Sequence, residues 1–284
     1  MAAYDDLIAK DNVHISNQSN GTPYNAGNAD DPTCTGTTNF GRTINEVYEA
    51  GILPVIAAGN SGQVGSTCTL SSPSAALGAF TVAGHGSNRN TDTETAVRSG
   101  SLSSTSSQGP ASLRTMVDLS AYEGRTLLPD VSGGYAYNNV GTSFAAPTVV
   151  AAALNFIHFY KSTFSDFIEN PGALAANMLL MGDRQGASGL QTQRFSNQWG
   201  AGRMKMRLWN TEGIDNPAIY ATGSVCVGHN QVVTIPLNSG NAFSSDIDYI
   251  KAVAYWHDTR HDMSAKAPVD TITMIATMLP ALWA

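Results

Sequence analysis

Charged residues are scarce in this sequence, since they make up 13% of its 284 residues, about half the usual share. The charges that are present lean acidic, with 15 Lys and Arg against 22 Asp and Glu, which argues against nucleic acid as a partner. No apolar run reaches the length of a membrane span, because the longest candidate, Val149–Phe159, is interrupted by Asn155 and His158. The first residues, MAAYDDLIAKD, lack the basic end and apolar middle of a signal peptide. We therefore expect neither a nucleic-acid partner nor a membrane partner.

Cysteine is also rare, with one residue at each of positions 34, 68 and 226. Cys34 and Cys68 lie in Gly/Thr-rich, loop-like sequence, so a Cys34–Cys68 disulfide with Cys226 left over is one interpretation. Three unrelated buried thiols are the other, and the sequence leaves both open. Because Gly, Ser, Thr and Asn are abundant, as in the long neutral loops of secreted hydrolases, we expect the parent protein to be secreted or extracellular.

Hydrophobic residues make up 42% of the chain, enough for a sizeable core. Two short apolar runs, Ile52–Asn60 and Ala79–Gly84, end in glycine or Gly-Asn and are typical of buried parallel strands. Helical patterns alternate with such runs, at Thr43–Gly51, Ser143–Ser162 and Pro171–Gly182. This alternation predicts an α/β fold in which helices flank a parallel sheet.

The pattern changes after Gly223, where runs such as Gln231–Leu237 and Asp270–Met278 show no helical period and are separated by turn residues. Such runs are typical of short strands in a β sandwich. We therefore divide the chain into a first domain at 1–218 and a C-terminal, sandwich-like β domain at 219–284, which we expect to be incomplete.

The stretch Gly141–Pro147, GTSFAAP, leads through a small-residue turn into Ser143 at the start of an apolar helix. A serine at that point lies at the positive end of the helix dipole, and its backbone N–H can face a developing oxyanion. Ser143 is therefore a candidate nucleophile, and an ordinary helix cap is the alternative. A lone hydroxyl is a poor nucleophile, so it needs an activating base.

Four stretches in this order resemble the subtilisin-like serine proteases (subtilases), over roughly residues 12–209. They are Val55–Gly62, Ser106–Pro110 with Leu127–Gly134, Gly141–Pro147, and Trp199–Trp209, the last of which resembles the family's helix after the serine. The resemblance implies a subtilisin-like sheet and peptide-bond hydrolysis through an acyl-enzyme on Ser143. It also maps the family's oxyanion asparagine onto Asn60, for which a simple turn residue is the alternative.

The family's catalytic Asp and His motifs have no counterpart before Asn12, because no histidine stands there and no aspartate follows a core strand. The resemblance therefore implies a truncated subtilase. In AGHGSN (83–88), His85 is a candidate surrogate base, although it aligns with a loop just past a core strand. Two other functions stay open: an esterase-like hydrolase acting on short activated esters through Ser143 with a non-standard base, and an inactive fragment or pseudoenzyme that binds peptide.

By the same resemblance, two stretches form walls of the substrate pocket. They are Ile15, Ser16 and Asn17, and Ala57, Ala58 and Gly59. We expect a peptide or an ester as substrate and no required cofactor. Calcium as a structural ion is a further expectation, with Asp92, Glu94 and the loop Asn25–Asp31 as ligands. For His257 and His261 we expect an exposed turn and no metal site. A sheet edge exposed near Asn12–Ser16 predicts self-association.

Overall fold

The computed structural model describes residues 2–10, 12–23, 34–62, 68–86, 101–110, 117–124, 127–137, 140–161, 170–183 and 196–206. Several sequence-based predictions lie outside these residues and are not tested by the structure. They are the C-terminal β domain at 219–284, the calcium ligands at 25–31, Asp92 and Glu94, and the turn that contains His257 and His261.

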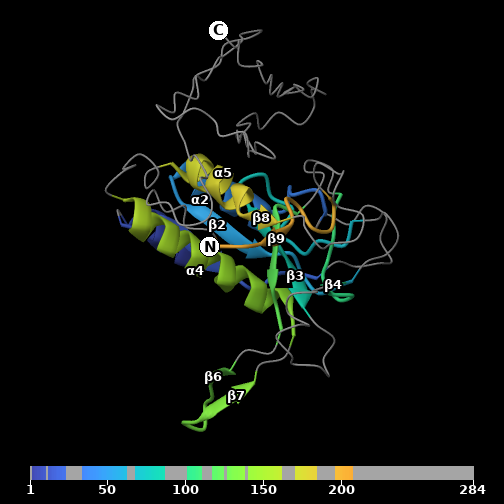
Figure 1. Cartoon of the computed structure of the whole chain (residues 1–284). Helices are drawn as coiled ribbons and strands as arrows, with labels where there is room; N and C mark the ends of the chain where they lie inside the picture. The colour runs from blue at the N-terminus through green and yellow to red at the C-terminus, as the bar shows by residue number, and fades with distance from the viewer. Residues whose placement is uncertain are drawn as a thin grey trace, which may run out of the picture.

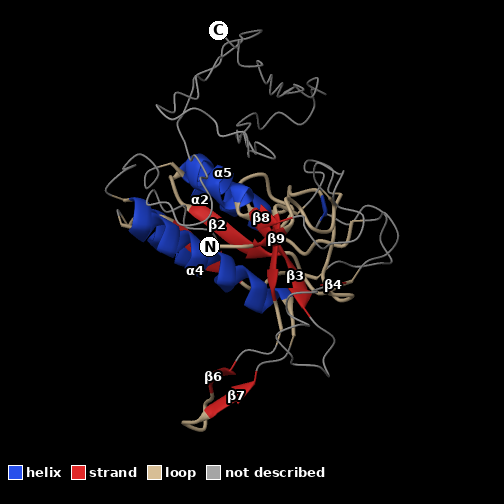
Figure 2. Ribbon diagram, in the orientation of Figure 1, coloured by secondary structure: helices blue, strands red, loops and turns tan. Residues whose placement is uncertain are grey.

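The described residues form an α/β fold, as the alternating pattern predicted (Figures 1 and 2). The helices are α1 (Ala2–Ile8), α2 (Asn39–Glu49), α4 (Thr142–Tyr160) and α5 (Pro171–Leu180). The strands are β1 (Ile15–Gln18), β2 (Leu53–Ala57), β3 (Phe80–Gly86), β4 (Ser101–Leu102), β5 (Leu119–Tyr122), β6 (Leu127–Pro129), β7 (Tyr135–Tyr137), β8 (Gly182–Asp183) and β9 (Arg203–Met204).

Five strands, in the order β1-β2-β3-β5-β9, pair in parallel and form the main sheet. The short strands β8 and β4 add to it in antiparallel fashion, on β9 and β3 respectively. Because β1 lies at the end of this order, it pairs on one side only among the described strands. The carboxyl ends of β1, β2, β3 and β5 lie at one edge of the sheet, where sites in open α/β folds usually form.

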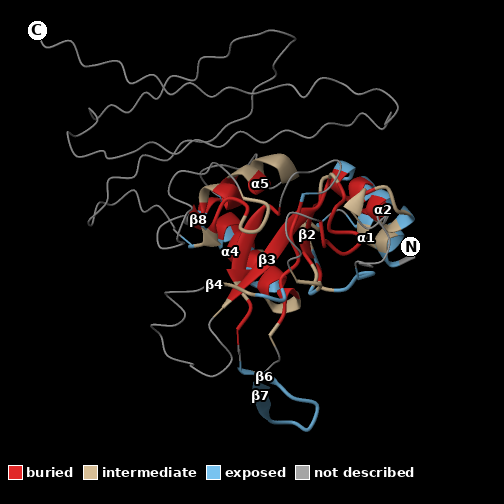
Figure 3. Cartoon of the chain, turned by 90° about the vertical axis from the view of Figure 1, so that its right-hand side faces the viewer, coloured by how far each residue is buried: buried red, intermediate tan, exposed pale blue. Residues whose placement is uncertain are grey.

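The sheet separates two layers of helices, with α4 and α5 on one face and α1 and α2 on the other (Figure 3). On the α4 face, the largest buried cluster joins residues of β2, β3 and β5 to the helix through Ala145, Ala146 and Phe156. The two alanines are fully buried. Since they carry only a methyl group, the first turn of α4 can lie directly on the strands.

Helix α4 is long and apolar enough to cross a membrane by length and composition alone, so the expectation that no apolar run reaches that length was wrong. A core helix of a globular domain passes the same test, and α4 packs on β1, β2, β3 and β5. Packing in the sheet's core cluster accounts for the apolar residues on the buried face of α4, whereas Leu154 and Phe159 are exposed.

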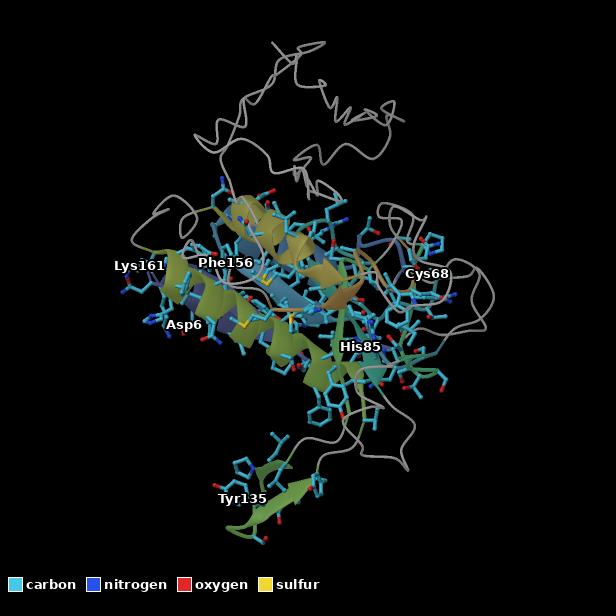
Figure 4. All side chains as sticks on the ribbon, viewed as in Figure 1. Asp6, Cys68, His85, Tyr135, Phe156 and Lys161 are labelled. Atoms are coloured by element: carbon cyan, nitrogen blue, oxygen red, sulfur yellow. A yellow bond between two sulfur atoms is a disulfide. The ribbon has the colours of Figure 1, made fainter. Side chains whose placement is uncertain are left out.

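Three local features differ from the sequence-based predictions. Helix α1 and the β6–β7 hairpin were not predicted, and the hairpin projects from the body with Tyr135 exposed (Figure 4). A helix was predicted from Trp199. As far as residue 206 that prediction is wrong, because the segment forms a turn and then β9. Gly200 and Gly202 have φ angles of 59° and 123°, which a right-handed helix does not permit, and Arg203 pairs with Ser120 of β5.

A disulfide joins Cys34 and Cys68, with a Cα–Cα distance of 6.2 Å. The two cysteines are 34 positions apart, and α2, β2 and the turn at Asn60 lie between them. Next to it, the Thr69 hydroxyl donates a hydrogen bond to the Gly62 carbonyl. The disulfide and this hydrogen bond therefore link Cys68 to Cys34 and Thr69 to Gly62, two residues after Asn60.

Candidate active site

Ser143 lies in the first turn of α4, at the carboxyl edge of the sheet and partly exposed. Its Oγ donates a hydrogen bond of 2.8 Å to the backbone carbonyl of Ser19, the residue directly after β1. In return, Ser19 Oγ donates one of 2.9 Å to the Ser143 carbonyl. This reciprocal pair fixes the direction of the Ser143 hydroxyl. A peptide carbonyl is too weak a base to take its proton, so the hydroxyl is oriented but not activated.

Asn60 follows β2 and lies against the start of α4. Its Oδ1 accepts hydrogen bonds of 3.0 Å from both the backbone N–H and the hydroxyl of Thr142. Thr142 is fully buried, and its Oγ1 accepts a further bond from the Gly59 N–H at 3.1 Å. Because Oδ1 is held by Thr142, the opposite end of the amide, Nδ2, is the end left to donate.

Two glycines give this amide its position. Gly59 has a φ of 110°, and a Cβ there would lie 3.0 Å from the side chains of Ser71 and Ser107. At Gly141, a Cβ would lie 3.2 Å from Asn60 Nδ2. A side chain at Gly59 would therefore strain the turn, and one at Gly141 would crowd the amide nitrogen.

The groups at this edge suit a developing negative charge. The first turn of α4 lies at the positive end of the helix dipole, where the Thr142 N–H is bonded to Asn60 and the Phe144 N–H to the Gly141 carbonyl. Asn60 follows β2 and Ser143 lies in the first turn of α4, and the bond from Thr142 to Asn60 joins these two segments. An oxyanion formed by attack of Ser143 on a carbonyl carbon needs donors such as Asn60 Nδ2 and the Ser143 N–H.

The residues predicted to line the substrate pocket occupy the ends of β1 and β2. Ile15 and Ser16 lie in β1, which pairs in register with β2. Ala57 and Ala58 are buried at the end of β2, and Gly59 begins the turn to Asn60. Ile15 and Ser16 pair with Leu53 and Pro54, the first residues of β2, so they lie toward the amino edge of the sheet, whereas Ala57, Ala58 and Gly59 lie at the carboxyl edge with Ser143. The pocket itself stays a prediction.

His85, the candidate surrogate base, lies near the end of β3 and is buried (Figure 4). Its neighbours on the strand show its orientation, since Val82 belongs to the α4-side cluster and Ala83 to a cluster on the opposite face. Side chains alternate along a strand, so His85 shares the face of Ala83. With β3 two strand spacings from β1, roughly 10 Å, nothing in the described structure links His85 to the Ser143 hydroxyl.

The surroundings of His85 favour the neutral imidazole. Its ring lies 6.0 Å from that of Trp199 and 6.5 Å from that of Tyr122, between centroids. Burial, with a smaller contribution from the positive charge of Arg203, lowers the pKa of His85 to about 4. Nδ1 has no hydrogen-bond partner among the residues that the structure describes. An imidazole held in this way is a weaker base than an exposed one.

We expect the buried His85 to make the protein acid-labile. Between about pH 6.5 and pH 4 the unfolded chain binds a proton at this residue and the folded chain does not, so the free energy of unfolding falls as the pH is lowered. The loss is complete below pH 4 and amounts to about 3 kcal/mol. Urea unfolding at several pH values, for wild type and His85→Phe, measures this directly.

Glu123 serves as a comparison for that experiment, because its pKa is shifted in the direction opposite to that of His85. Burial raises the pKa of its carboxyl, and the Ser103 hydroxyl lowers it to a smaller extent. Stability linked to Glu123 is therefore lost as the pH rises, not as it falls. The difference between the two unfolding curves isolates His85, and parallel curves would contradict the prediction.

Two residues of this site were not predicted from the sequence, Ser19 and Thr142. Ser19 contacts a residue 124 positions away, and Thr142 one that is 82 positions away. Neither separation leaves a local signal. Among the described residues no group of three or more His, Cys, Asp or Glu is placed to hold a metal ion.

Comparison with known proteins adds to this geometry. A family model described as Peptidase_S8, the subtilase family, matches residues 1–173. Two solved structures are similar in fold: "Sphericase", with a TM-score of 0.52 and 22% identity, and "S41 Psychrophilic Protease", with 0.51 and 21%. Each match covers 72% of this chain and 61% of the other, so the chain spans about three fifths of their length. No curated protein sequence matches the chain.

Proposed function

Because the chain belongs to the subtilase family, we propose that it carries the nucleophile and the oxyanion hole of a serine hydrolase that cleaves peptide bonds through an acyl-enzyme. Ser143 Oγ attacks the carbonyl carbon, and the Ser143 N–H and Asn60 Nδ2 donate to the oxyanion. The observation that carries this proposal is the pair of hydrogen bonds from Thr142 to Asn60 Oδ1, which orients the amide beside Ser143.

The proposal assigns the general base to residues beyond those described. Within the described structure the Ser143 hydroxyl donates to the Ser19 carbonyl, which cannot accept the proton. An amide leaves only after its nitrogen is protonated by the same base. By resemblance to the family, a histidine oriented by an aspartate supplies that base, and the substrate is a peptide.

A second candidate function is hydrolysis of short activated esters. The observation that favours it is the same Ser19 carbonyl partner, because it leaves Ser143 oriented without a base. A nitrophenolate leaves without protonation, so the ester depends less on a general acid than the amide does. In this case Ser143 works with a non-standard base, for which a water molecule is the candidate.

A third candidate is an inactive fragment or pseudoenzyme that binds peptide or self-associates. It is favoured by the position of β1 at the end of the strand order, with one neighbour among the described strands. An unpaired edge is a template for another strand. The disulfide supports export of the protein in every case, because such bonds persist mainly outside the cytosol.

A fluorophosphonate probe and two parallel assays distinguish the three functions. We expect the probe to label the chain at Ser143, located by mass spectrometry of the peptides, and p-nitrophenyl acetate to be turned over faster than casein. Labelling with casein cleavage favours the peptidase, and labelling with ester turnover alone favours the esterase. If the folded protein neither labels nor turns over either substrate, both hydrolase proposals fail, and sedimentation velocity then tests self-association.

A further inference from the structure

The end of β1 is held from both faces of the sheet. In register, Gln18 pairs with Ile56, which belongs to the cluster on the α1 and α2 side. Ser19 is the next residue along, and its Oγ reaches the opposite layer, where it donates to the Ser143 carbonyl. Neighbouring side chains of a strand point to opposite faces. Any group that fixes Gln18 therefore acts on the backbone that Ser143 contacts.

Tyr4 of α1 is that group. Its hydroxyl donates a hydrogen bond to Gln18 Oε1. The ring packs edge-on against Phe40 at 5.9 Å between centroids and against the cluster that includes Ile44 and Ile56. Burial raises the pKa of Tyr4, so its hydroxyl keeps its proton and remains a donor at neutral pH.

The other end of the Gln18 amide is also used. Nε2 donates a hydrogen bond of 3.3 Å to the backbone carbonyl of Asn20, and the side chain is 6% exposed. The amide thus joins α1 to the chain on the far side of Ser19. Since a buried amide with one end unpaired is costly, the two bonds hold Gln18 in one orientation.

We propose that Tyr4 and Gln18 are positioning residues for the nucleophile: they fix the Ser19 carbonyl, and through it the direction of the Ser143 hydroxyl. Neither residue reaches the reacting atoms, and the inference rests on the proposed function of Ser143. It assigns to α1, a helix that carries no predicted site residue, a part in acylation. The proposed path runs from the Tyr4 hydroxyl to the Gln18 side chain, and from the Gln18 backbone to the neighbouring Ser19 carbonyl.

The first test measures the second-order rate at which a fluorophosphonate labels Ser143 in Tyr4→Phe, Gln18→Met and the double variant. We expect each single variant to label about threefold to tenfold more slowly, the factor that corresponds to one lost hydrogen bond. The double variant should be no slower than Gln18→Met, because both changes break the same path. With p-nitrophenyl acetate, kcat should fall while KM stays near the wild-type value.

Asn45→Ala is the matched control. Asn45 is buried in α2, and its Oδ1 accepts a hydrogen bond from the Gly78 N–H, away from β1. The variant loses one buried hydrogen bond, as Tyr4→Phe does, but none on the path to Ser19. Equal slowing by Asn45→Ala, or wild-type rates in the Tyr4 and Gln18 variants, would overturn the inference, since either result removes the specific effect of the path.

A second test of the roles of Tyr4 and Gln18 does not depend on activity. Failure of the wild-type protein to label would count against the proposed function alone, and this second test could still be carried out. The midpoint of urea unfolding is measured for Tyr4→Phe, Ser143→Ala and their combination. If Tyr4 holds Ser19 for Ser143, loss of the Ser143 hydroxyl shifts the midpoint less in the Tyr4→Phe background than in wild type. Additive shifts would overturn the inference.

Discussion

Replacing Ser143 with alanine is expected to abolish labelling by a fluorophosphonate and to reduce turnover of p-nitrophenyl acetate to the rate in buffer. The change removes the atom that forms the covalent bond, so no acyl-enzyme can arise. In a subtilisin with all of its catalytic groups, loss of the serine lowers kcat about 10⁶-fold. The loss here is limited by how far ester turnover by the wild-type chain exceeds the rate in buffer.

Ser132→Ala is the control for this prediction, because Ser132 lies exposed on the turn between β6 and β7 and donates to the Asp130 carboxylate. It should label and turn over ester at wild-type rates. Ser143→Ala also loses the hydrogen bond to the Ser19 carbonyl, at a cost of about 1 kcal/mol in the free energy of unfolding. A urea titration therefore accompanies the assay. Ester turnover that survives in a folded Ser143→Ala protein would remove Ser143 as the nucleophile.

The sequence predicted the layered fold well because the strands that build it are buried on both faces. Such strands read as short apolar runs: β2 lies within its predicted stretch, and β3 begins within its own and extends two residues beyond it. Helix α4 begins one residue before Ser143, so the local motif located the serine with respect to its helix correctly. These features depend on residues close together in the chain, and such residues leave a periodic signal.

Features that depend on distant contacts were not predicted. The helix signal of a short segment such as Ala2–Ile8 is weak by itself, because seven residues form a stable helix only when packed. Tyr4 contributes that packing against Phe40 of α2. A helix was predicted at Trp199–Met204, but the segment forms a turn and a strand. This follows from pairing with β5 and from the positive φ angles of its two glycines, and not from local propensity.

The same distinction applies to the site. Asn60 and Ser143 stand in short motifs, but the bonds that orient them run to Thr142 and Ser19 across the sheet. For His85, in contrast, the local sequence suggested a catalytic role that its surroundings in the fold do not favour. Its His-Gly sequence resembles a catalytic motif, whereas its place on β3 gives it aromatic neighbours and a lowered pKa. A local pattern indicates which atoms are present, and packing determines what those atoms can reach.

Replacing Asn60 is expected to have the second largest effect, a fall of about 10²–10³ in kcat for p-nitrophenyl acetate, or roughly 3–4 kcal/mol of transition-state stabilisation. The prediction is sharpest with two variants. Asn60→Asp keeps Oδ1, the acceptor for both Thr142 donors, and replaces only the donor Nδ2. Asn60→Ala loses acceptor and donor together.

These two variants separate orientation from donation. The carboxylate of Asn60→Asp lies at the positive end of α4, so the fold tolerates it, yet it cannot donate to an oxyanion and repels the developing charge. Asn60→Asp should therefore lose at least as much kcat as Asn60→Ala, whereas Asn60→Ala alone should lose about 1–2 kcal/mol of stability in urea unfolding. Wild-type turnover in Asn60→Asp would mean that Nδ2 does not contact the oxyanion.

Thr142→Val completes the argument, because it removes a hydroxyl that touches no substrate. The Thr142 hydroxyl donates to Asn60 Oδ1 and accepts from the Gly59 N–H, and valine keeps the side-chain shape and the backbone N–H. If its role is to hold the Asn60 amide, kcat should fall about tenfold, the equivalent of one hydrogen bond, and no further in an Asn60→Ala background. An additional fall in that background would mean that Thr142 acts on the reaction by a route independent of Asn60, and the oxyanion hole would then depend on the first turn of α4 alone.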